Sequence, residues 1–224
     1  MEQICKKCNY VNNEEAIYCS SCGEKLNNSN NREEYLIEQL QKHYQDNKYQ
    51  KLIPTLKELE ALENKPLYQL EMANIYIEGI GIPVNEKEAF FWYEKAAKQG
   101  FAQAEYNLAI MYKRGISVAQ NNQKAFDYIL KAAKQGLVDA QFNMGVFYMR
   151  GETVKKDYHQ AFYWHSKALE NGDIQSYHNL AILYYMGWGT FQNINKATEY
   201  YHLAIQYGDN SIIESFRILD GRGY

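Results

Sequence analysis

The chain has 224 residues, with 24 Lys and Arg against 27 Asp and Glu, and so a formal net charge of −3 at pH 7. This balance excludes a chain-wide basic field for nucleic-acid phosphates. The mean hydropathy of −0.59 and the polar start MEQICKKC argue against a membrane span and a secretory signal, so we expect a cytoplasmic protein. Hydrophobic residues make up 46% of the chain and only three residues are Pro, which predicts a mainly helical fold.

All four cysteines lie within the first 22 residues, as two C-x-x-C pairs: Cys5 and Cys8, then Cys19 and Cys22. Two disulfides could use the same residues, but such pairs in a chain without an export signal are typical of a tetrahedral zinc site. Four thiolates leave no open position for water, so the expected role of one zinc ion is structural. Metal ligation supplies about 10 to 16 kcal/mol in such peptides, which would fold a segment too short to bury a core.

The stretch ICKKCNYVNNEEAIYCSSCGEKL, residues 4 to 26, resembles the short zinc-ribbon family. It shares both cysteine pairs, Tyr18 before the second pair and Leu26 after it, while Asn9 stands where the family usually has Gly. The resemblance implies a zinc ribbon at residues 1–26 that holds one zinc ion on the four cysteines. It does not indicate what else this segment contacts.

The rest of the chain repeats with a period of 36 residues. The segment KAAKQG ends at Gly100 and again at Gly136. A repeat of this length predicts an α-solenoid, in which each unit buries its apolar face against its neighbours. Two further sets of residues keep the step: Gly79, Gly115, Gly151 and Gly187; and Tyr76, Tyr112, Tyr148 and Tyr184.

Each unit is predicted to hold two helices, A and B. In the unit that begins at residue 102, apolar residues from Ala104 to Tyr112 recur on one face of a helix A that stops at Gly115. Helix B is expected to follow Asn121, because Asn side chains cap first-turn amides, and to end at Gly136 in the left-handed conformation. The corresponding predicted N-caps of the other units are Asn85, Asp157 and Asn193.

Weaker matches to the period extend the solenoid at both ends. In a degenerate first helical pair, Asn64 takes the place of the stop glycine, and Pro54 falls near the first turn of helix B. The Asn- and Ser-rich stretch before this pair is expected to be a flexible linker. The predicted segments are a zinc ribbon at 1–26, the linker at 27–31, the degenerate pair at 32–65, four repeats at 66–208 and a C-terminal capping helix at 209–224.

Between residues 66 and 208, segments such as AEYNLAIMYKRG and KAFDYILKAAKQG resemble the Sel-one-like repeat (SLR), a relative of the tetratricopeptide repeat. Gly79 and Gly81 match the family's G-x-G loop, while Ser117 and Thr153 replace the second glycine in the middle units. The resemblance implies an all-α, right-handed solenoid that assembles partners as an adaptor. Some secreted relatives have a disulfide in each repeat, but no cysteine follows Cys22 here, so secretion is not implied.

One side of the predicted A helices, which lines the concave surface in such solenoids, is apolar and aromatic with Arg at its edge. Aromatic residues and Arg dominate binding hot spots, so this side is a candidate peptide groove. A tight superhelix could instead bury it against the next helix A. We call the following residues the inner strip: Tyr106, Asn107, Ile110, Lys113, Arg114, Phe142, Asn143, Val146, Met149, Arg150, His178, Asn179, Ile182, Tyr185 and Met186.

Asn107, Asn143 and Asn179 form a column along the inner strip. Asn within a helix is unfavourable without a reason. The amides would either bind the main chain of a peptide or tie each helix A to an adjacent repeat, and the sequence favours neither role.

The sequence contains no catalytic motif that we can identify. The five histidines share no metal-ligand spacing, and His165 is expected to pack near the aromatic column of helix B.

We therefore predict a cytoplasmic, bacterial, non-enzymatic adaptor that binds a protein segment on the inner strip, with the zinc ribbon as a second contact. Arg114 and Arg150, one repeat apart, would favour an acidic peptide. The alternatives are a nucleic-acid-associated factor that acts through the ribbon's lysines and a hydrolase built on the solenoid. The partner and the oligomeric state are not predicted.

Overall fold

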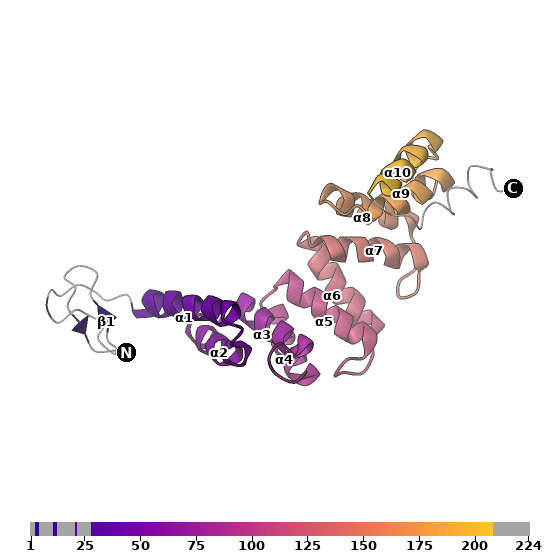
Figure 1. Cartoon of the computed structure of the whole chain (residues 1–224). Coiled ribbons are helices and arrows are strands. Elements are labelled where there is room, and N and C mark those ends of the chain that lie inside the picture. The colour runs from indigo at the N-terminus through magenta and orange to yellow at the C-terminus, as the bar shows by residue number, and fades with distance from the viewer. Residues whose placement is uncertain (1–2, 5–10, 13–20, 22–27, 208–224) are drawn as a thin grey trace. The chain divides into compact units, whose positions relative to one another are not determined.

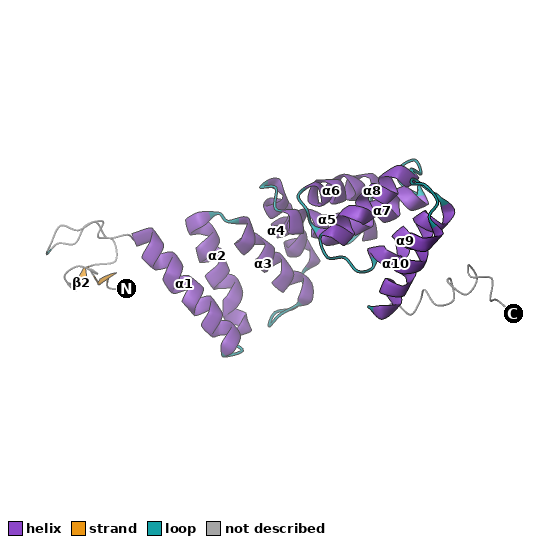
Figure 2. Cartoon of the chain, turned by 90° about the horizontal axis from the view of Figure 1, so that it is seen from above, coloured by secondary structure: helices purple, strands orange, loops and turns teal. Residues whose placement is uncertain are grey.

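The computed structural model describes residues 3–4, 11–12, 21 and 28–207 (Figures 1 and 2). All four cysteines and the predicted capping helix lie outside these residues. The chain forms two compact units, residues 1–92 and 93–224. Within the described part of the chain, no helix combines the length and the apolar character that a membrane crossing requires.

Two short strands lie near the N-terminus. Strand β1 (Gln3–Ile4) pairs with β2 (Val11–Asn12) in an antiparallel ladder, with Ile4 opposite Val11. The segment between the two strands contains the first C-x-x-C pair. The ribbon and its zinc ion stay a prediction, because the four proposed ligands are not described.

The first unit contains α1 (Asn28–Gln45), the 3-10 turn η1 (Tyr49–Lys51), α2 (Leu52–Glu63) and α3 (Pro66–Glu78), and α4 (Glu86–Lys98) runs across the unit boundary. The prediction of a flexible linker was wrong for residues 28–31, which are the first turn of α1. Asn and Ser are weak formers of helix interiors but are common where helices begin, and at this place they begin one.

Helix α2 confirms two details of the degenerate pair. Asn64 ends the helix in the left-handed conformation, with φ of +47°, and Pro54 lies in the first turn. The buried face of α2 is displaced by one residue from the 36-residue step, however. Two repeat steps span 72 residues, but the buried residues of α2 match those of α6 at a spacing of 73. Leu52, Ile53, Leu56 and Leu59 match Ala125, Phe126, Ile129 and Ala132 in this way.

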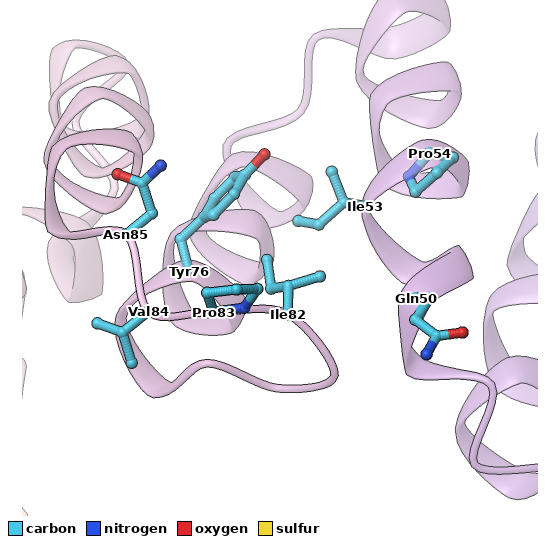
Figure 3. A pocket seen from close by; sticks show the side chains of 8 residues that line it. All are labelled: Gln50, Ile53, Pro54, Tyr76, Ile82, Pro83, Val84 and Asn85. Carbon is cyan, nitrogen blue, oxygen red and sulfur yellow. The ribbon is translucent and has the colours of Figure 1, made fainter.

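A cavity of about 410 Å³ lies between the start of α2, the helix α3 and the loop that follows α3 (Figure 3). Ile53 points from α2 toward Tyr76 and Ile82, and Pro54 lies beside it on the same helix (Figure 3). Pro83 and Val84 of the loop complete the apolar part of the wall.

Up to residue 207, where the description ends, the second unit contains three helical pairs. Within each pair the helices pack closely, and each pair packs on the next. The pairs are α5 (Ala102–Arg114) with α6 (Asn122–Lys134), α7 (Val138–Arg150) with α8 (Tyr158–Glu170), and α9 (Ser176–Met186) with α10 (Ile194–Gln206). This is the predicted solenoid of helix-turn-helix repeats.

The predicted starts of the B helices are confirmed. The Asn121 side chain accepts a hydrogen bond of 2.9 Å from the amide of Lys124, and Asp157 accepts from two amides of the first turn of α8. Asn85 and Asn193 make the same contact at α4 and α10. Each cap satisfies a first-turn donor that has no partner within the helix.

The predicted stops are confirmed as well. Every helix A from α3 to α9 ends at a glycine with φ between +68° and +71°, and Gly136 after α6 has φ of +93°. In the loops, Ser117 keeps the left-handed conformation of the glycine it replaces, at φ of +61°, whereas Thr153 does not. A β-branched side chain disfavours this region, so the third loop takes another path.

Small residues allow helices to cross closely at the predicted positions. A methyl group at Gly145 would meet the ring of His165 at 2.5 Å. His165 itself is fully buried, and Phe142 lies edge-on to it with ring centroids 5.4 Å apart. The expectation that His165 is a packing residue is therefore confirmed.

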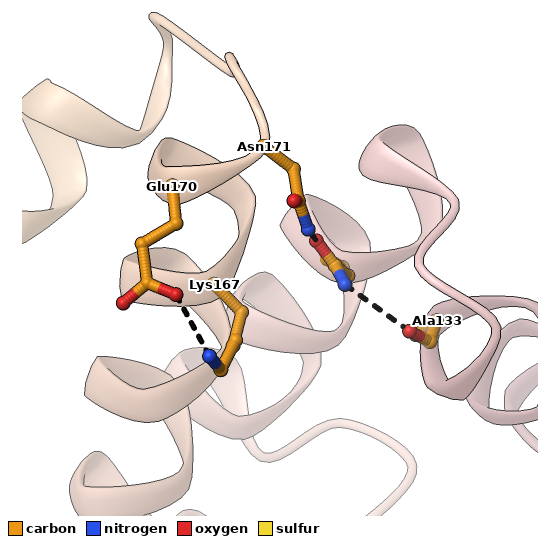
Figure 4. A network of polar contacts seen from close by, with 5 residues as sticks. Ala133, Lys167, Glu170 and Asn171 are labelled. Carbon is orange, nitrogen blue, oxygen red and sulfur yellow. Dashed lines mark hydrogen bonds and ion pairs between the residues drawn. The ribbon is translucent and has the colours of Figure 1, made fainter.

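Buried polar residues hold the same position in α5 and α7, and at α7 the contacts run from Asn171 to Ala133 (Figure 4). The Gln141 amide donates to the carbonyl of Ala133 at the end of α6, and its oxygen accepts from Asn171 after α8. One step earlier, Glu105 accepts from Gln135 at 2.8 Å and is also buried. Burial raises the pKa of Glu105, while Lys131 and the Gln135 hydrogen bond act in the opposite direction.

Candidate functional site

The inner strip belongs to helices α5, α7 and α9 of the second unit. Its cationic members, Lys113, Arg114 and Arg150, are exposed, as is Met186, whereas its other members are half-buried. The strip is thus neither a fully open groove nor a closed core.

Part of the strip packs between helices. Met149 contacts the buried cluster formed by Ala161, Leu180 and Leu183. Ile182 and Tyr185 contact the cluster of α9 and α10 that surrounds Tyr201. These contacts account for the half-burial of Met149, Ile182 and Tyr185.

The asparagine column has a structural role at its central member. The Asn143 amide donates to the hydroxyl of Tyr106 at 3.1 Å and to the carbonyl of Asp139 at 2.8 Å. It therefore connects α7 to α5, which was one of the two roles left open by the sequence. Asn107 accepts a hydrogen bond from Gln103 within its own helix. Burial raises the pKa of the Tyr106 hydroxyl, which stays protonated at neutral pH.

The strip contains a small hollow between α5 and α7. It is lined by Lys113, Asn143, Val146, Phe147, Arg150 and Glu152. The Lys113 ammonium lies 5.5 Å from the centre of the Phe147 ring, in cation–π range. Arg150 lies 3.8 Å from the Glu152 carboxylate, and both side chains are mostly exposed, so this ion pair contributes little to stability.

The hollow differs in membership from the sequence prediction. The sequence predicts that Arg114 and Arg150 act together. In the structure, Lys113 and not Arg114 lines the hollow with Arg150. Phe147 was missed because its position is a core column in every unit, and Glu152 was missed because it follows a stop glycine in the loop. The stop glycine Gly151, which turns the chain directly after Arg150, was the signal that could have indicated Glu152.

One cluster has the residue types of a hydrolase but the wrong arrangement. The Ser176 hydroxyl donates to Asp173 at 2.5 Å, and the Nδ1 atom of His165 lies 3.3 Å from the same hydroxyl oxygen. In a catalytic triad the histidine lies between the acid and the serine, and accepts the serine proton. Here the serine proton is directed to Asp173, and both Ser176 and His165 are 0% exposed.

Burial lowers the pKa of His165 to about 3, so the ring is neutral at physiological pH. A neutral, enclosed histidine with no access for substrate fits a packing role. Among the described residues, no group of three or more His, Cys, Asp and Glu side chains is arranged to hold a metal ion.

Comparison with known proteins identifies four copies of the Sel1 repeat, at residues 66–101, 102–137, 138–173 and 174–209. A solved Sel1 repeat protein from Oxalobacter formigenes is 34% identical, with a TM-score of 0.69 over 77% of this chain and 70% of that one. A protective antigen of uropathogenic Escherichia coli with an SLR fold is 24% identical, with a TM-score of 0.73; the match covers 88% of this chain and 42% of the antigen. None of the curated proteins is significantly similar to the sequence.

Proposed function

The chain belongs to the Sel1 repeat family, and from this premise we propose that it is an adaptor that binds an acidic protein segment along the inner strip. Sel1 repeat proteins generally mediate protein–protein interactions, and their solenoid is typically a scaffold without catalytic activity. The proposal adds the surface and the chemistry of the partner.

The observation that carries the proposal is the hollow at the junction of α5 and α7. Its two cations, Lys113 and Arg150, come from successive A helices. We call the apolar part of its lining, Val146 and Phe147, the floor. A carboxylate of the partner could pair with both cations in place of the weak Arg150–Glu152 ion pair, while an adjacent apolar side chain covers the floor. Charge-assisted hydrogen bonds of this kind are stronger than neutral ones, and the guanidinium can take a carboxylate in two-pronged geometry.

The half-buried strip supports the same conclusion. Packing between the helices holds its apolar side chains in place, so a partner would meet an ordered surface and would lose little free energy in ordering it. The half-exposed part of Tyr106 and Phe142 would provide aromatic contact beside the cations.

The experiment is a selection of random displayed peptides on the immobilised protein. We expect the enriched peptides to combine an acidic residue with an apolar one. Truncating a desolvated charged partner typically costs about 2 to 5 kcal/mol. Lys113→Glu with Arg150→Glu should therefore lower the affinity for a resynthesised peptide at least ~30-fold, measured by fluorescence anisotropy.

The matched control is Lys57→Glu with Lys134→Glu, which makes the same change in net charge at exposed positions of α2 and α6. It should alter the affinity less than ~3-fold. Equal losses in the two variants would mean that the interaction depends on overall charge, and enrichment of peptides without acidic residues would place the binding site elsewhere. The melting temperature should be unchanged in both variants, because all four side chains are exposed.

We also propose that the four N-terminal cysteines bind one structural zinc ion and that the ribbon provides a second contact with the partner. The spacing of the cysteines supports this, as does the strand pair β1–β2, whose connecting segment carries Cys5 and Cys8. The zinc would stabilise this segment and would take no part in a reaction. A reducing compartment would keep the cysteines available as thiolates.

A further inference from the structure

The cavity in the first unit occupies a place that aromatic rings fill in later units. The Phe126 ring of α6 lies edge-on to Tyr148, with centroids 6.1 Å apart and planes at 84°. One unit later, Phe162 of α8 lies edge-on to Tyr184, at 5.2 Å and 88°. In both places a phenylalanine from helix B closes the space beside the tyrosine of the next helix A.

The first unit lacks this phenylalanine. The corresponding residue of α2 is Pro54 by the 36-residue step, or Ile53 by the pattern of burial. Both are smaller than Phe, and both line the open cavity beside Tyr76. The cavity therefore lies beside Tyr76 at the place where later units put a phenyl ring against the equivalent tyrosine, in the edge-to-face geometry that aromatic pairs prefer.

The last described unit presents a phenyl ring with no such cover. Phe191 lies in the loop between α9 and α10 and is 94% exposed, far more than any other large hydrophobic residue in the described part of the chain. A large apolar side chain at full exposure marks an interaction site when its surroundings hold it there.

Several contacts order the loop around Phe191. Trp188 stacks on Tyr158 with centroids 4.5 Å apart, and Gly189 lies so close to Tyr158 that a methyl group there would overlap its carbonyl. The Gln192 side chain donates to the carbonyl of Tyr185 at 2.8 Å. The exposed ring is thus held in a preorganised loop, which lowers the cost of binding.

The two regions carry opposite charge. Residues 28–92 contain eleven acidic and seven basic side chains, a net charge of −4, and residues 93–207 contain nine acidic and twelve basic ones, a net charge of +3. Two copies would therefore attract each other when the second region of one approaches the first region of the other, and would repel in the like-to-like arrangement.

We propose that the chain self-associates head to tail, with Phe191 of one copy in the cavity beside Tyr76 of a second copy. The contact uses no side chain of the inner strip. Because the two surfaces differ, the contact is heterologous and can add further copies in sequence unless a ring closes.

The test is sedimentation equilibrium of the full chain over a range of concentrations up to ~1 mM. The average mass should rise with concentration in the wild type and stay at the monomer mass in Phe191→Asp. The matched control is Phe91→Asp, which makes the same substitution at a phenylalanine of α4 that is 52% exposed, and it should associate as the wild type does. A monomeric wild type, or equal losses in the two variants, would overturn the proposal.

A second variant closes the cavity from within. Ile53→Phe should fill the space beside Tyr76 as Phe126 and Phe162 do in their units, so it should abolish self-association while holding or raising the melting temperature. Mixing Ile53→Phe with Phe191→Asp should give a complex of two chains and no larger species, because one variant keeps the ring and the other keeps the cavity. Failure of the mixture to form this complex would also overturn the proposal.

Discussion

The substitution Glu105→Gln is expected to stabilise the protein. Glu105 is 4% exposed, and it accepts a single hydrogen bond that the structure assigns, from Gln135. Gln141 holds the same position in the next unit. Its side-chain oxygen accepts a hydrogen bond from Asn171, directly after α8, and its side-chain amide donates to the carbonyl of Ala133 near the end of α6. A carboxylate at this position can make the first contact but has no hydrogen to donate for the second.

The size of the effect follows from these contacts. An added hydrogen bond contributes about 0.5 to 1.5 kcal/mol net, here to the carbonyl of Ala97, which is one step before Ala133. Replacing the carboxylate also removes the desolvation that raises its pKa, although the attraction to Lys131 is lost. A gain of about 1 kcal/mol or more at pH 7 should raise the melting temperature by ~2 to 4 °C for a chain of this size.

The gain should depend on pH in a specified direction. Because the pKa of Glu105 is raised on folding, the folded state holds the proton to a higher pH than the unfolded state does. The wild type therefore loses stability as the pH rises from the unfolded pKa of about 4.3 through the raised folded pKa. The advantage of the amide should be small near pH ~3, where the acid is neutral in both states, and full at pH 7.

The assay is urea unfolding of both proteins at these two pH values, with Gln141→Glu as the reverse control. Gln141→Glu removes the donor to Ala133 and places a charge at a buried position, so it should destabilise the protein by about 2 kcal/mol or more at pH 7. A lower midpoint for Glu105→Gln at pH 7 would show that Lys131 favours the charged form of Glu105. A gain that is the same at both pH values would show that the ionisation of Glu105 does not affect stability. Either result would refute the reasoning.

Three further substitutions test separate features. Gly136→Val should cost about 1 to 2 kcal/mol and Gly136→Asn less, since an added Cβ would meet no atom within 4 Å apart from its chain neighbours, and only left-handed strain separates the two variants; equal unfolding midpoints would contradict this. Gly145→Ala should cost about 1 to 3 kcal/mol through contact with His165, and a double-mutant cycle with His165→Ala should show sub-additive losses. Cys19→Ser should remove one zinc ion, measured by elemental analysis, with little loss of helical circular dichroism; loss of all helix would mean that the ribbon and the solenoid do not fold separately.

The sequence could predict the repeat frame because its determinants are local. An Asn or Asp before helix B caps the helix through the amides of the next turn alone, and a stop glycine ends a helix through its own backbone angles. Asn121 and Gly115 therefore have the same roles however the helices pack. Each such signal occurs in four units at a constant step, which fixed the expected helix starts and stops of the solenoid.

The sequence could not predict what depends on contacts between units. The degree of burial of the inner strip depends on how far α7 lies from α5, and this distance is set by side chains from both helices. The register of α2 shows the same limit: Asn64 keeps the 36-residue step, but the buried face that contains Ile53 does not. The loop at Thr153 departs for a local reason, and its β-branched side chain was a usable signal.

Residues that recur at the 36-residue step serve the fold of this chain, whereas residues that do not recur are candidates for recognition. Asn143 belongs to a column that recurs in three units, and its amide is used inside the chain to connect α7 with α5. Lys113, in contrast, stands in a column whose other members are Ile77, Met149 and Tyr185. The frame tolerates a cation, a thioether or a phenol there, so packing does not dictate the choice. Selection for a particular partner can act on a residue that the fold does not require. Lys113 is such a residue, and it lies beside Arg150 at the apolar floor of the hollow. The proposed contact is therefore assigned to the hollow and not to the asparagine column.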